Sequence, residues 1–367
     1  MLNVAQYYAT ALNGDFGTAR SVRGWCEGLA SAGVNVRLVV DGDAIRLPPP
    51  KGVECVPMAH VLRGRRRIPA KLEPLTGQAD VVVLHGGWTV DNLVVGAWAA
   101  RKGIPYVVTA HGVYNARVLG RRKVALKRAW NALLERRHLS RALAVHCFFR
   151  EERDDLERLG VLPSMVVAPT GFAPPAGLKW KGGGGYLLWL GRYDPECKGL
   201  DLLLEALHLL PADERPPLRL HGPDWHGKKR SVADLNVKLG LEEWVTVGEA
   251  IYGEEKSRLL EDATGFVYPS RWDACPTAIL ESASCGIPTL VTPYPLGSLL
   301  ASRGGAVLAE ATAESVAAGL KRILSSEAAE VGRKGAVVVR ESLSWDVVAR
   351  SWLEQVEALL ADRATSS

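Results

Sequence analysis

The chain of 367 residues has 47% apolar residues, 23% charged residues and a formal net charge of +5, a balance found in soluble globular proteins. The length predicts two domains, and no apolar run approaches the roughly 20 residues of a membrane-spanning helix. The first residues lack the basic start and apolar centre of a signal peptide, and the six scattered cysteines form no CxxC pair or Cys/His cluster, so we expect a cytoplasmic protein without disulfides or a metal site.

The first half of the chain alternates between apolar strands and helices, which predicts a parallel α/β sheet. The run DVVVLH is almost continuously apolar, as a parallel strand buried on both faces should be. In chain order, we expect strands at 2–8, 35–40, 80–85, 104–111, 142–148 and 165–172, with helices at 18–32, 90–102 and 126–138 and another ending at 159.

The turn after the first strand carries Gly14 and Gly17 in G-x-x-G spacing, a weak match to a phosphate-binding turn. The full G-x-G-x-x-G fingerprint is absent, which argues against a nicotinamide-dependent dehydrogenase. Asp41 and Asp43 end the second strand, and we interpret them as a polar turn in preference to a ribose or metal site.

Two histidines, His85 and His111, end successive predicted strands, and each is followed by glycine. A single histidine is usually structural. In open α/β sheets, however, ligands bind at the carboxyl ends of the strands, so this repeated placement favours a functional role.

The basic residues are concentrated in the first half. Residues 1–173 hold 24 Lys and Arg against 14 Asp and Glu, whereas the remainder holds 21 against 26. They cluster at 63–67 and again from Arg117 to Arg137. Two interpretations stay open, a solvated face and attraction to anionic lipid headgroups or an anionic acceptor; nucleic acid is disfavoured because no binding motif accompanies the charge.

A Pro- and Gly-rich stretch, APPAGLKWKGGGG, interrupts the alternation and predicts a domain boundary. We expect a first domain at 1–173, a second at 174–344 and a final helical segment at 345–367. The last helix has Trp345, Val348, Trp352 and Val356 on one side, which predicts packing back on the first domain.

The second domain is expected to repeat the α/β alternation with crossover helices. Strands are predicted at 186–191, 218–222, 245–248 and 265–268 with a short one after Pro288, and helices at 200–210, 231–239, 254–260, 277–285, 313–325, 328–340 and 345–360.

Within this domain, the stretch from Tyr268 to Thr292 reads as strand, loop, helix and strand. We place Pro276 at the first helical position, where its missing N–H costs nothing, and end the helix at Gly286. The loop carries Asp273 and the helix Glu281. On this pattern alone, a scaffold unit and the floor of a ligand site are equally supported.

The first turn of the second domain, LGRYDPECKGLD, places Arg192 and Lys198 before a helix. Cations beside a helix amino terminus favour an anion, and arginine can chelate phosphate oxygens. Sugar hydroxyls need acceptors such as Asp273 and Glu281. Cations and acids together therefore indicate a nucleoside diphosphate sugar.

These two stretches carry a family resemblance. The segments LGRYDPECKGLD and DACPTAILESASCGIPTLVT are similar to the phosphate turn and the E-x7-E segment of retaining glycosyltransferases of family 4, the glycosyl transferases group 1. The resemblance implies the GT-B fold, α/β with two Rossmann-like doubly wound parallel-sheet domains facing a cleft. The first acid here is Asp273 instead of glutamate, which implies an altered sugar preference.

The resemblance also implies roles for individual residues. Glu281 should bind the ribose, Arg192 and Lys198 the diphosphate, and Asp273 the donor-sugar hydroxyls. His111 should lie beside the donor sugar, and the Gly14–Gly17 turn should approach the phosphate. The backbone of Ala274, Cys275, Pro276 and Thr277 should contact the sugar or phosphate, with the Cys275 side chain a packing residue.

The activity implied is retaining, metal-independent transfer of a hexosyl group from a nucleotide sugar to an acceptor hydroxyl, in glycan, glycolipid or glycoconjugate biosynthesis, with no other cofactor. Trp88, Tyr114 and Arg117 are candidates for the acceptor pocket, and the basic first domain suggests peripheral contact with an anionic membrane. The alternatives are a GT-B epimerase, a phosphorylase and a non-catalytic nucleotide-sugar-binding protein.

Overall fold

A computed structural model describes residues 1–9, 17–41, 48–61, 68–75, 79–120, 124–174 and 177–366. The chain divides into two units, Met1–Gly171 with Ser344–Ser367, and Phe172–Leu343. Across the described ranges, no helix is both long and apolar enough to cross a membrane.

Unit 1 contains a seven-stranded sheet in the order β3-β2-β1-β4-β5-β6-β7, with every neighbouring pair parallel. Its strands are β1 (Asn3–Tyr8), β2 (Asn35–Asp41), β3 (Glu54–Met58), β4 (Val81–His85), β5 (Tyr106–Thr109), β6 (Ala144–Cys147) and β7 (Met165–Val167).

Helices cover both faces of this sheet. They are α1 (Gly17–Ser31), η3 (Glu73–Leu75), α2 (Val90–Arg101), α3 (Ala116–Leu119), α4 (Val124–Trp130), the π-helix η4 (Asn131–Glu135), α5 (Arg136–Arg141), α6 (Glu152–Arg158) and α15 (Trp345–Ser366). Alternate residues of β1 enter different cores: Val4 and Tyr8 pack with α1 and α15, whereas Ala5 and Tyr7 pack with α2 and α5.

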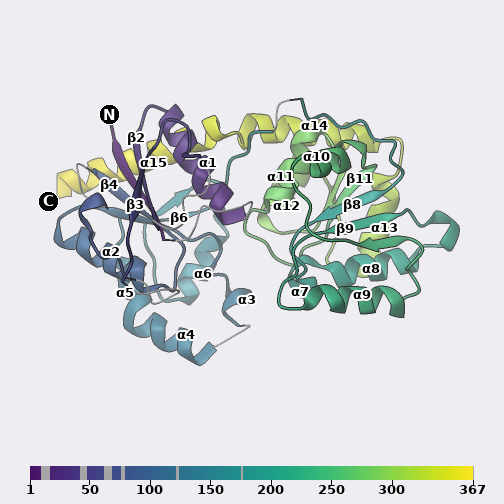
Figure 1. The fold of residues 1–367 in the computed structure, drawn as a ribbon, viewed down its shortest axis with the longest axis horizontal. Helices are drawn as coiled ribbons and strands as arrows, with labels where there is room; N and C mark the ends of the chain where they lie inside the picture. The colour runs from purple at the N-terminus through teal and green to yellow at the C-terminus, as the bar shows by residue number, and fades with distance from the viewer. Residues whose placement is uncertain are drawn as a thin grey trace. The chain divides into compact units, whose positions relative to one another are not determined.

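Helix α15 belongs to unit 1 and lies beside α1 (Figure 1). Its Trp345 fits against Gly24, where an added Cβ would lie 1.9 Å from the indole. Trp352 is only 1% exposed. The Gln355 side chain accepts from the backbone N–H of Val167 at 2.9 Å and donates to its carbonyl at 3.0 Å, which ties the helix to the edge strand β7.

Unit 2 contains a six-stranded parallel sheet in the order β10-β9-β8-β11-β12-β13. Figure 1 shows α8 and α9 on one face and α10, α11 and α14 on the other. The elements are β8 (Leu187–Leu190), α7 (Pro195–Lys198), α8 (Leu200–Leu209), η5 (Ala212–Glu214), β9 (Leu218–His221), α9 (Lys228–Lys238), β10 (Val245–Val247), α10 (Gly253–Asp262), β11 (Gly265–Tyr268), α11 (Thr277–Cys285), β12 (Thr289–Val291), α12 (Pro295–Ser302), β13 (Val307–Leu308), α13 (Ala313–Ile323) and α14 (Ala328–Ser342).

The two parallel α/β sheets confirm the predicted fold class. The elements that were not predicted include β3, β13, α3, α7 and α12, because short edge strands and short helices carry too few residues for a clear period. The helix Thr277–Cys285 has its predicted bounds, but Pro276 is its N-cap in extended conformation (ψ 118°) instead of its first helical residue. Gly286 ends that helix in the left-handed region at φ 85°, as expected.

Candidate active site

The predicted donor-site residues of unit 2 lie in the segments that follow two adjacent strands, in loops or in the helices α7 and α11. Strands β8 and β11 pair directly. Lys198 ends the short helix that follows β8, and Asp273 lies in the loop that follows β11. In an open α/β sheet, this edge is where ligands bind.

The structure joins Lys198 and Asp273 in an ion pair between Nζ and Oδ2. Both side chains are largely shielded, with 8% and 15% exposed respectively. The same Oδ2 accepts a 2.9 Å hydrogen bond from the Tyr268 hydroxyl. Burial, reinforced by the Asp273 charge, holds the pKa of Tyr268 well above its ordinary value, so the hydroxyl keeps its proton and remains a donor. Asp273 and Lys198 thus form one cluster, which the Tyr268 hydroxyl holds in place.

Close backbone packing holds these two loops together. Gly199 has φ +64°, and a Cβ at this position would lie 1.9 Å from the carbonyl oxygen of Pro269. The Ser270 hydroxyl donates to the Cys197 carbonyl at 2.8 Å. Glycine is therefore required here for both its conformation and its lack of a side chain.

Arg192 is placed differently from Lys198. Its side chain is exposed, and its guanidinium carbon lies 4.4 Å from the centroid of the Trp225 ring. Stacking of this kind orients the guanidinium while leaving its N–H groups available to an anion. Trp225 was not predicted as a site residue, since nothing in its local sequence indicates which loop it meets.

Glu281 lies on α11 and pairs with Lys256 of α10, with 2.5 Å between Nζ and Oε2. The two side chains are 8% and 17% exposed, respectively. Lys256 was missed by the sequence analysis. One signal was available: Lys256 lies four residues before the buried Leu260, which places it on the inward face of its helix.

The segment before α11 combines small and rigid residues. Ala274 is buried, and Cys275 is half-buried. The first-turn amides start at Thr277, because Pro276 has no N–H.

In unit 1, His111 follows β5 by two residues and has the left-handed conformation φ +50°. Its Nε2 lies 2.9 Å from Nδ1 of His85. The structure therefore brings together the two histidines that the sequence placed at successive strand ends. Gly17 is the first residue of α1, whereas Gly14 lies outside the described residues.

The predicted acceptor residues Trp88 and Tyr114 surround a buried carboxylate. Glu135 is 1% exposed and accepts from the Trp88 backbone N–H at 3.0 Å, the Tyr114 hydroxyl at 2.7 Å and the Trp130 indole at 2.7 Å. Tyr114 is itself 3% exposed. Its expected place in an acceptor pocket was wrong, because the hydroxyl satisfies an interior charge instead.

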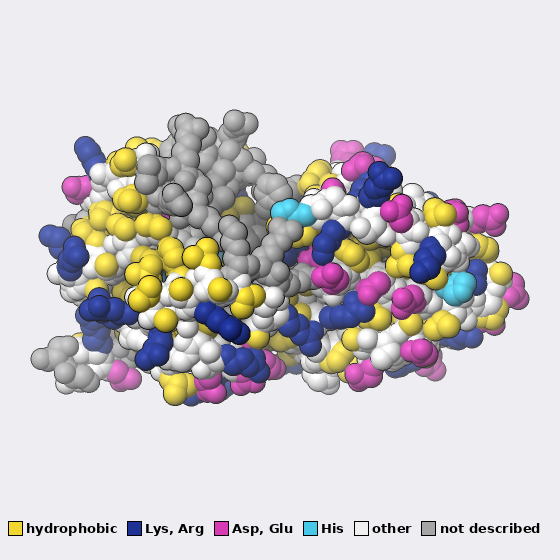
Figure 2. Space-filling view, turned by 90° about the horizontal axis from the view of Figure 1, so that it is seen from below, with side chains coloured by type: hydrophobic (Ala, Val, Ile, Leu, Met, Phe, Trp, Pro, Cys, Tyr) yellow, Lys and Arg dark blue, Asp and Glu magenta, His cyan; other side chains and the backbone are white. Residues whose placement is uncertain are grey.

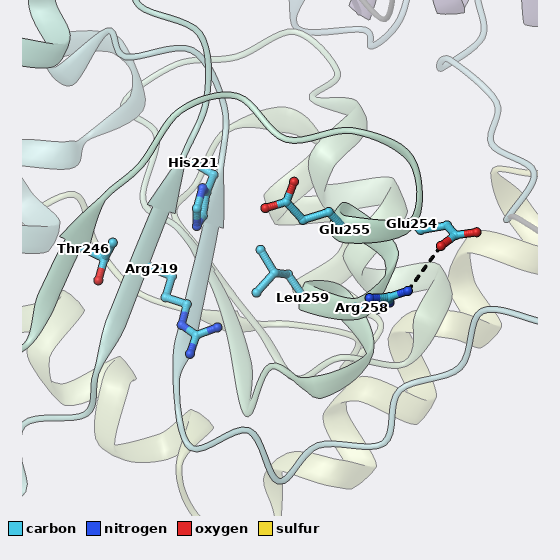
Figure 3. A pocket seen from close by; sticks show the side chains of 7 residues that line it. All are labelled: Arg219, His221, Thr246, Glu254, Glu255, Arg258 and Leu259. Carbon is cyan, nitrogen blue, oxygen red and sulfur yellow. Dashed lines mark hydrogen bonds and ion pairs between the residues drawn. The ribbon is translucent and has the colours of Figure 1, made fainter.

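A cavity of about 660 Å³ opens between α10 and the strands β9 and β10 (Figure 3). It is lined by Arg219, His221, Thr246, Glu254, Glu255, Arg258 and Leu259. Among the described residues, none of those predicted for the site lines this cavity. The cavity is therefore separate from the candidate site. We take as that site the loops that carry Lys198 and Asp273 at the carboxyl edge of the sheet, and call them the loop cluster.

Comparison with known proteins gives a consistent result. Residues 16–171 match the family model of the glycosyl transferase 4-like domain, and residues 175–335 match that of glycosyl transferases group 1. A stretch of 124 residues is 35% identical to O-antigen chain mannosyltransferase B of Escherichia coli; it covers 32% of this chain and only 31% of that relative.

Solved structures share the fold over almost the whole chain. Sucrose-phosphate synthase from Thermosynechococcus elongatus superposes with a TM-score of 0.73 at 18% identity, covering 99% of this chain and 100% of that one. HepE of Anabaena, solved with UDP and glucose, gives 0.72 at 15% identity over 98% and 100%. WaaG, a glycosyltransferase of lipopolysaccharide biosynthesis, gives 0.66 at 17% identity over 96% and 98%.

Proposed function

The chain belongs to the glycosyl transferases group 1 family, and from this premise we propose that it transfers a hexosyl group from a nucleoside diphosphate sugar to an acceptor hydroxyl, with retention of anomeric configuration and without a metal ion. The observation that carries the proposal is the buried Lys198–Asp273 pair at the carboxyl edge of the sheet. It sets a cation for phosphate directly beside an acceptor for sugar hydroxyls.

Two relatives support the choice of donor class. The matched stretch of the mannosyltransferase supports transfer of a hexose in glycan biosynthesis. HepE has been solved with UDP and glucose and with UDP-glucose, which supports a nucleotide sugar as donor here. We assign neither mannose nor glucose to this chain.

Donor binding would exchange partners within the ion pairs. The diphosphate takes Lys198, and the released Asp273 carboxylate, still oriented by Tyr268, accepts from sugar hydroxyls. Glu281 accepts from the ribose hydroxyls while Lys256 maintains its position. Arg192, stacked on its tryptophan, contributes a fork of N–H donors to the diphosphate.

The chemical step breaks the bond between the anomeric carbon and the phosphate oxygen, and the electron pair leaves with the diphosphate. Arg192 and Lys198 stabilise that developing charge, each supplying about 2.7–4 kcal/mol by analogy with single donors in preorganised anion sites. The acceptor oxygen bonds to the anomeric carbon from the same face, and its proton leaves with the departing phosphate. The two cations neutralise the leaving group, which is why no metal is invoked.

The test is incubation with a panel of labelled nucleotide sugars, with and without candidate acceptors and with a chelator. Arg192→Ala should lower kcat by about 100-fold or more. Lys181→Ala is the matched control, because the Lys181 side chain is 65% exposed and lies outside the loop cluster. Near-normal turnover of Arg192→Ala would refute the leaving-group role, and nucleotide-sugar binding without transfer would favour a non-catalytic protein.

We also propose peripheral contact with an anionic membrane through the outer surface of α4, η4 and α5. Leu126 and Leu133 are 60% and 74% exposed there, next to the exposed Arg128, Arg136 and Arg137. Figure 2, seen from the side of α4, shows hydrophobic side chains bordered by Lys and Arg on unit 1. Apolar side chains with flanking cations are typical of an interfacial helix.

Vesicle sedimentation tests the membrane proposal. Binding to phosphatidylglycerol vesicles, weakened by salt and by the double substitution Leu126→Ser/Leu133→Ser, is expected. Equal sedimentation with purely zwitterionic vesicles, or no effect of the double substitution, would contradict it.

A further inference from the structure

Three polar side chains form a chain through the interior of unit 1. Oε1 of Gln6, on β1, lies 2.6 Å from Nε2 of His85, and Nδ1 of His85 lies 2.9 Å from Nε2 of His111. Gln6 and His85 are 1% and 7% exposed. His85 ends β4, which is the neighbour of both β1 and β5 in the sheet, so the chain runs across three adjacent strands.

The chemistry of the groups decides where the protons lie. An amide oxygen only accepts, so Nε2 of His85 carries a proton and donates to Gln6. Burial, together with the neighbouring imidazoles of His111 and His146, lowers the pKa of His85 well below 6.5, so the ring is neutral and its Nδ1 has no proton. That nitrogen can only accept, which places a proton on Nε2 of His111.

The surroundings hold this arrangement in place. The Asn92 side chain donates to the carbonyl oxygens of His85 and Gly86, both at 3.1 Å, which fixes the backbone at the end of β4. Tyr8 meets the His85 ring edge-on, and Phe148 meets the His111 ring edge-on. His111 itself keeps a backbone conformation that non-glycine residues rarely adopt, which indicates that its neighbours over-determine its position.

We propose that Gln6 and His85 are positioning residues that hold His111 as the neutral Nε2–H tautomer, so that Nδ1 is the atom it presents to substrate. An unprotonated Nδ1 accepts a hydrogen bond from a sugar or acceptor hydroxyl and adds no positive charge that would compete for the diphosphate. The meeting of His111 with a hydroxyl rests on the function proposed above, whereas the tautomer does not.

Nitrogen NMR of protein labelled with ¹⁵N-histidine tests the tautomer directly, because the two neutral forms differ in their coupling patterns. The His111 signals are assigned by their loss in His111→Asn. At neutral pH the wild-type protein should show a proton on Nε2 of His111. A proton on Nδ1 would overturn the proposal without any further variant.

Gln6→Glu provides the sharper test. A carboxylate beside Nε2 of His85 favours the imidazolium form, whose Nδ1–H then donates to His111 and moves the His111 proton to Nδ1. Gln6→Met removes the acceptor with little change of shape and should give a mixture of tautomers. Unchanged His111 signals in both variants would show that Gln6 and His85 do not set the tautomer of His111, and would overturn the proposal. His138, which packs on Tyr106 in the core cluster on the other face of the sheet, is the internal control and should keep its signals.

Kinetics separate this inference from the proposed function. Gln6→Glu should lower kcat roughly 10-fold, the equivalent of one neutral hydrogen bond, with little change in donor KM. If the His111 tautomer changes in Gln6→Glu as expected but His111→Ala transfers sugar normally, the positioning role of Gln6 and His85 stands and the substrate role of His111 fails. If His111→Ala abolishes transfer but substitution of Gln6 leaves the His111 tautomer unchanged, the positioning role of Gln6 and His85 fails and the substrate role of His111 stands.

Discussion

Replacing Lys256 by methionine removes the cation that pairs with the Glu281 carboxylate inside unit 2. The pair has 2.5 Å between its charged atoms, and the side chains are 17% and 8% exposed. Removing one partner of a buried pair costs about 3–5 kcal/mol, because the remaining charge stays desolvated. The residual exposure of Lys256 places the expected cost at the lower end, about 3 kcal/mol.

The double substitution Lys256→Met/Glu281→Gln removes both charges and should recover most of this loss, since an apolar and a neutral polar group replace the pair. The coupling free energy from the double-mutant cycle should therefore be about 2–3 kcal/mol. For a domain the size of unit 2, a loss of about 3 kcal/mol lowers the melting temperature by about 6–12 °C.

Differential scanning calorimetry and urea unfolding measure the four proteins of the cycle. Lys321→Met is the matched control, because the side chains of its ion pair with Glu214 in the same unit are 58% and 50% exposed, and its unfolding should match that of the wild type. Additive effects of the two single substitutions would refute the reasoning, as would a Lys256→Met variant destabilised by less than about 1 kcal/mol.

The same variants report on ribose recognition. In a thermal-shift assay, wild-type protein should be stabilised more by a nucleoside diphosphate than by its 2′,3′-dideoxy analogue. Glu281→Gln should narrow that difference, because a neutral amide is the weaker acceptor for a diol. Equal discrimination in both proteins would contradict the ribose role of Glu281.

Three further outcomes follow from single positions. Gly199→Ala should destabilise unit 2 by more than about 2 kcal/mol, because its Cβ would lie 1.9 Å from the Pro269 carbonyl oxygen. Gly240→Ala is the control, because Gly240 has the same φ of +64° but its Cβ would meet nothing within 4 Å. Equal melting temperatures of the two variants would contradict the steric reason. Burial lowers the pKa of His138 from 6.5 to about 4. Its contribution to the stability of unit 1 is therefore complete above pH 6.5 and falls by up to about 1.4 kcal/mol per pH unit below it. Calorimetry of His138→Gln should find that the stability of unit 1 falls less steeply with decreasing pH than in the wild type. Trp352→Ala should destabilise unit 1 by about 3–5 kcal/mol while calorimetric titration finds nucleotide binding unchanged; loss of the unit 2 transition instead would refute the placement of α15.

Local signals in the sequence predicted most of the elements. Continuous apolar runs such as Val81–His85 fit strands buried on both faces, and Gly286 followed by Pro288 ended α11 where the structure ends it. The sequence also predicted that the cations and acids of unit 2 and the histidines of unit 1 follow the carboxyl ends of strands. Strand–helix alternation brings all such loops of one parallel sheet to the same edge of that sheet. These inferences need only periodicity, caps and turn chemistry, which act over a few residues.

The partners of the site residues were decided by tertiary structure alone. Lys198 meets Asp273 although 75 positions separate them in the chain, Lys256 meets Glu281 because α10 packs on α11, and His85 meets His111 because β4 and β5 are neighbours. The sequence determined which charged and polar groups this protein carries and the edge of the sheet to which they are brought. Which pairs form, and how far each is removed from water, depends on the register of strands and the packing of helix faces, and no short-range pattern encodes either.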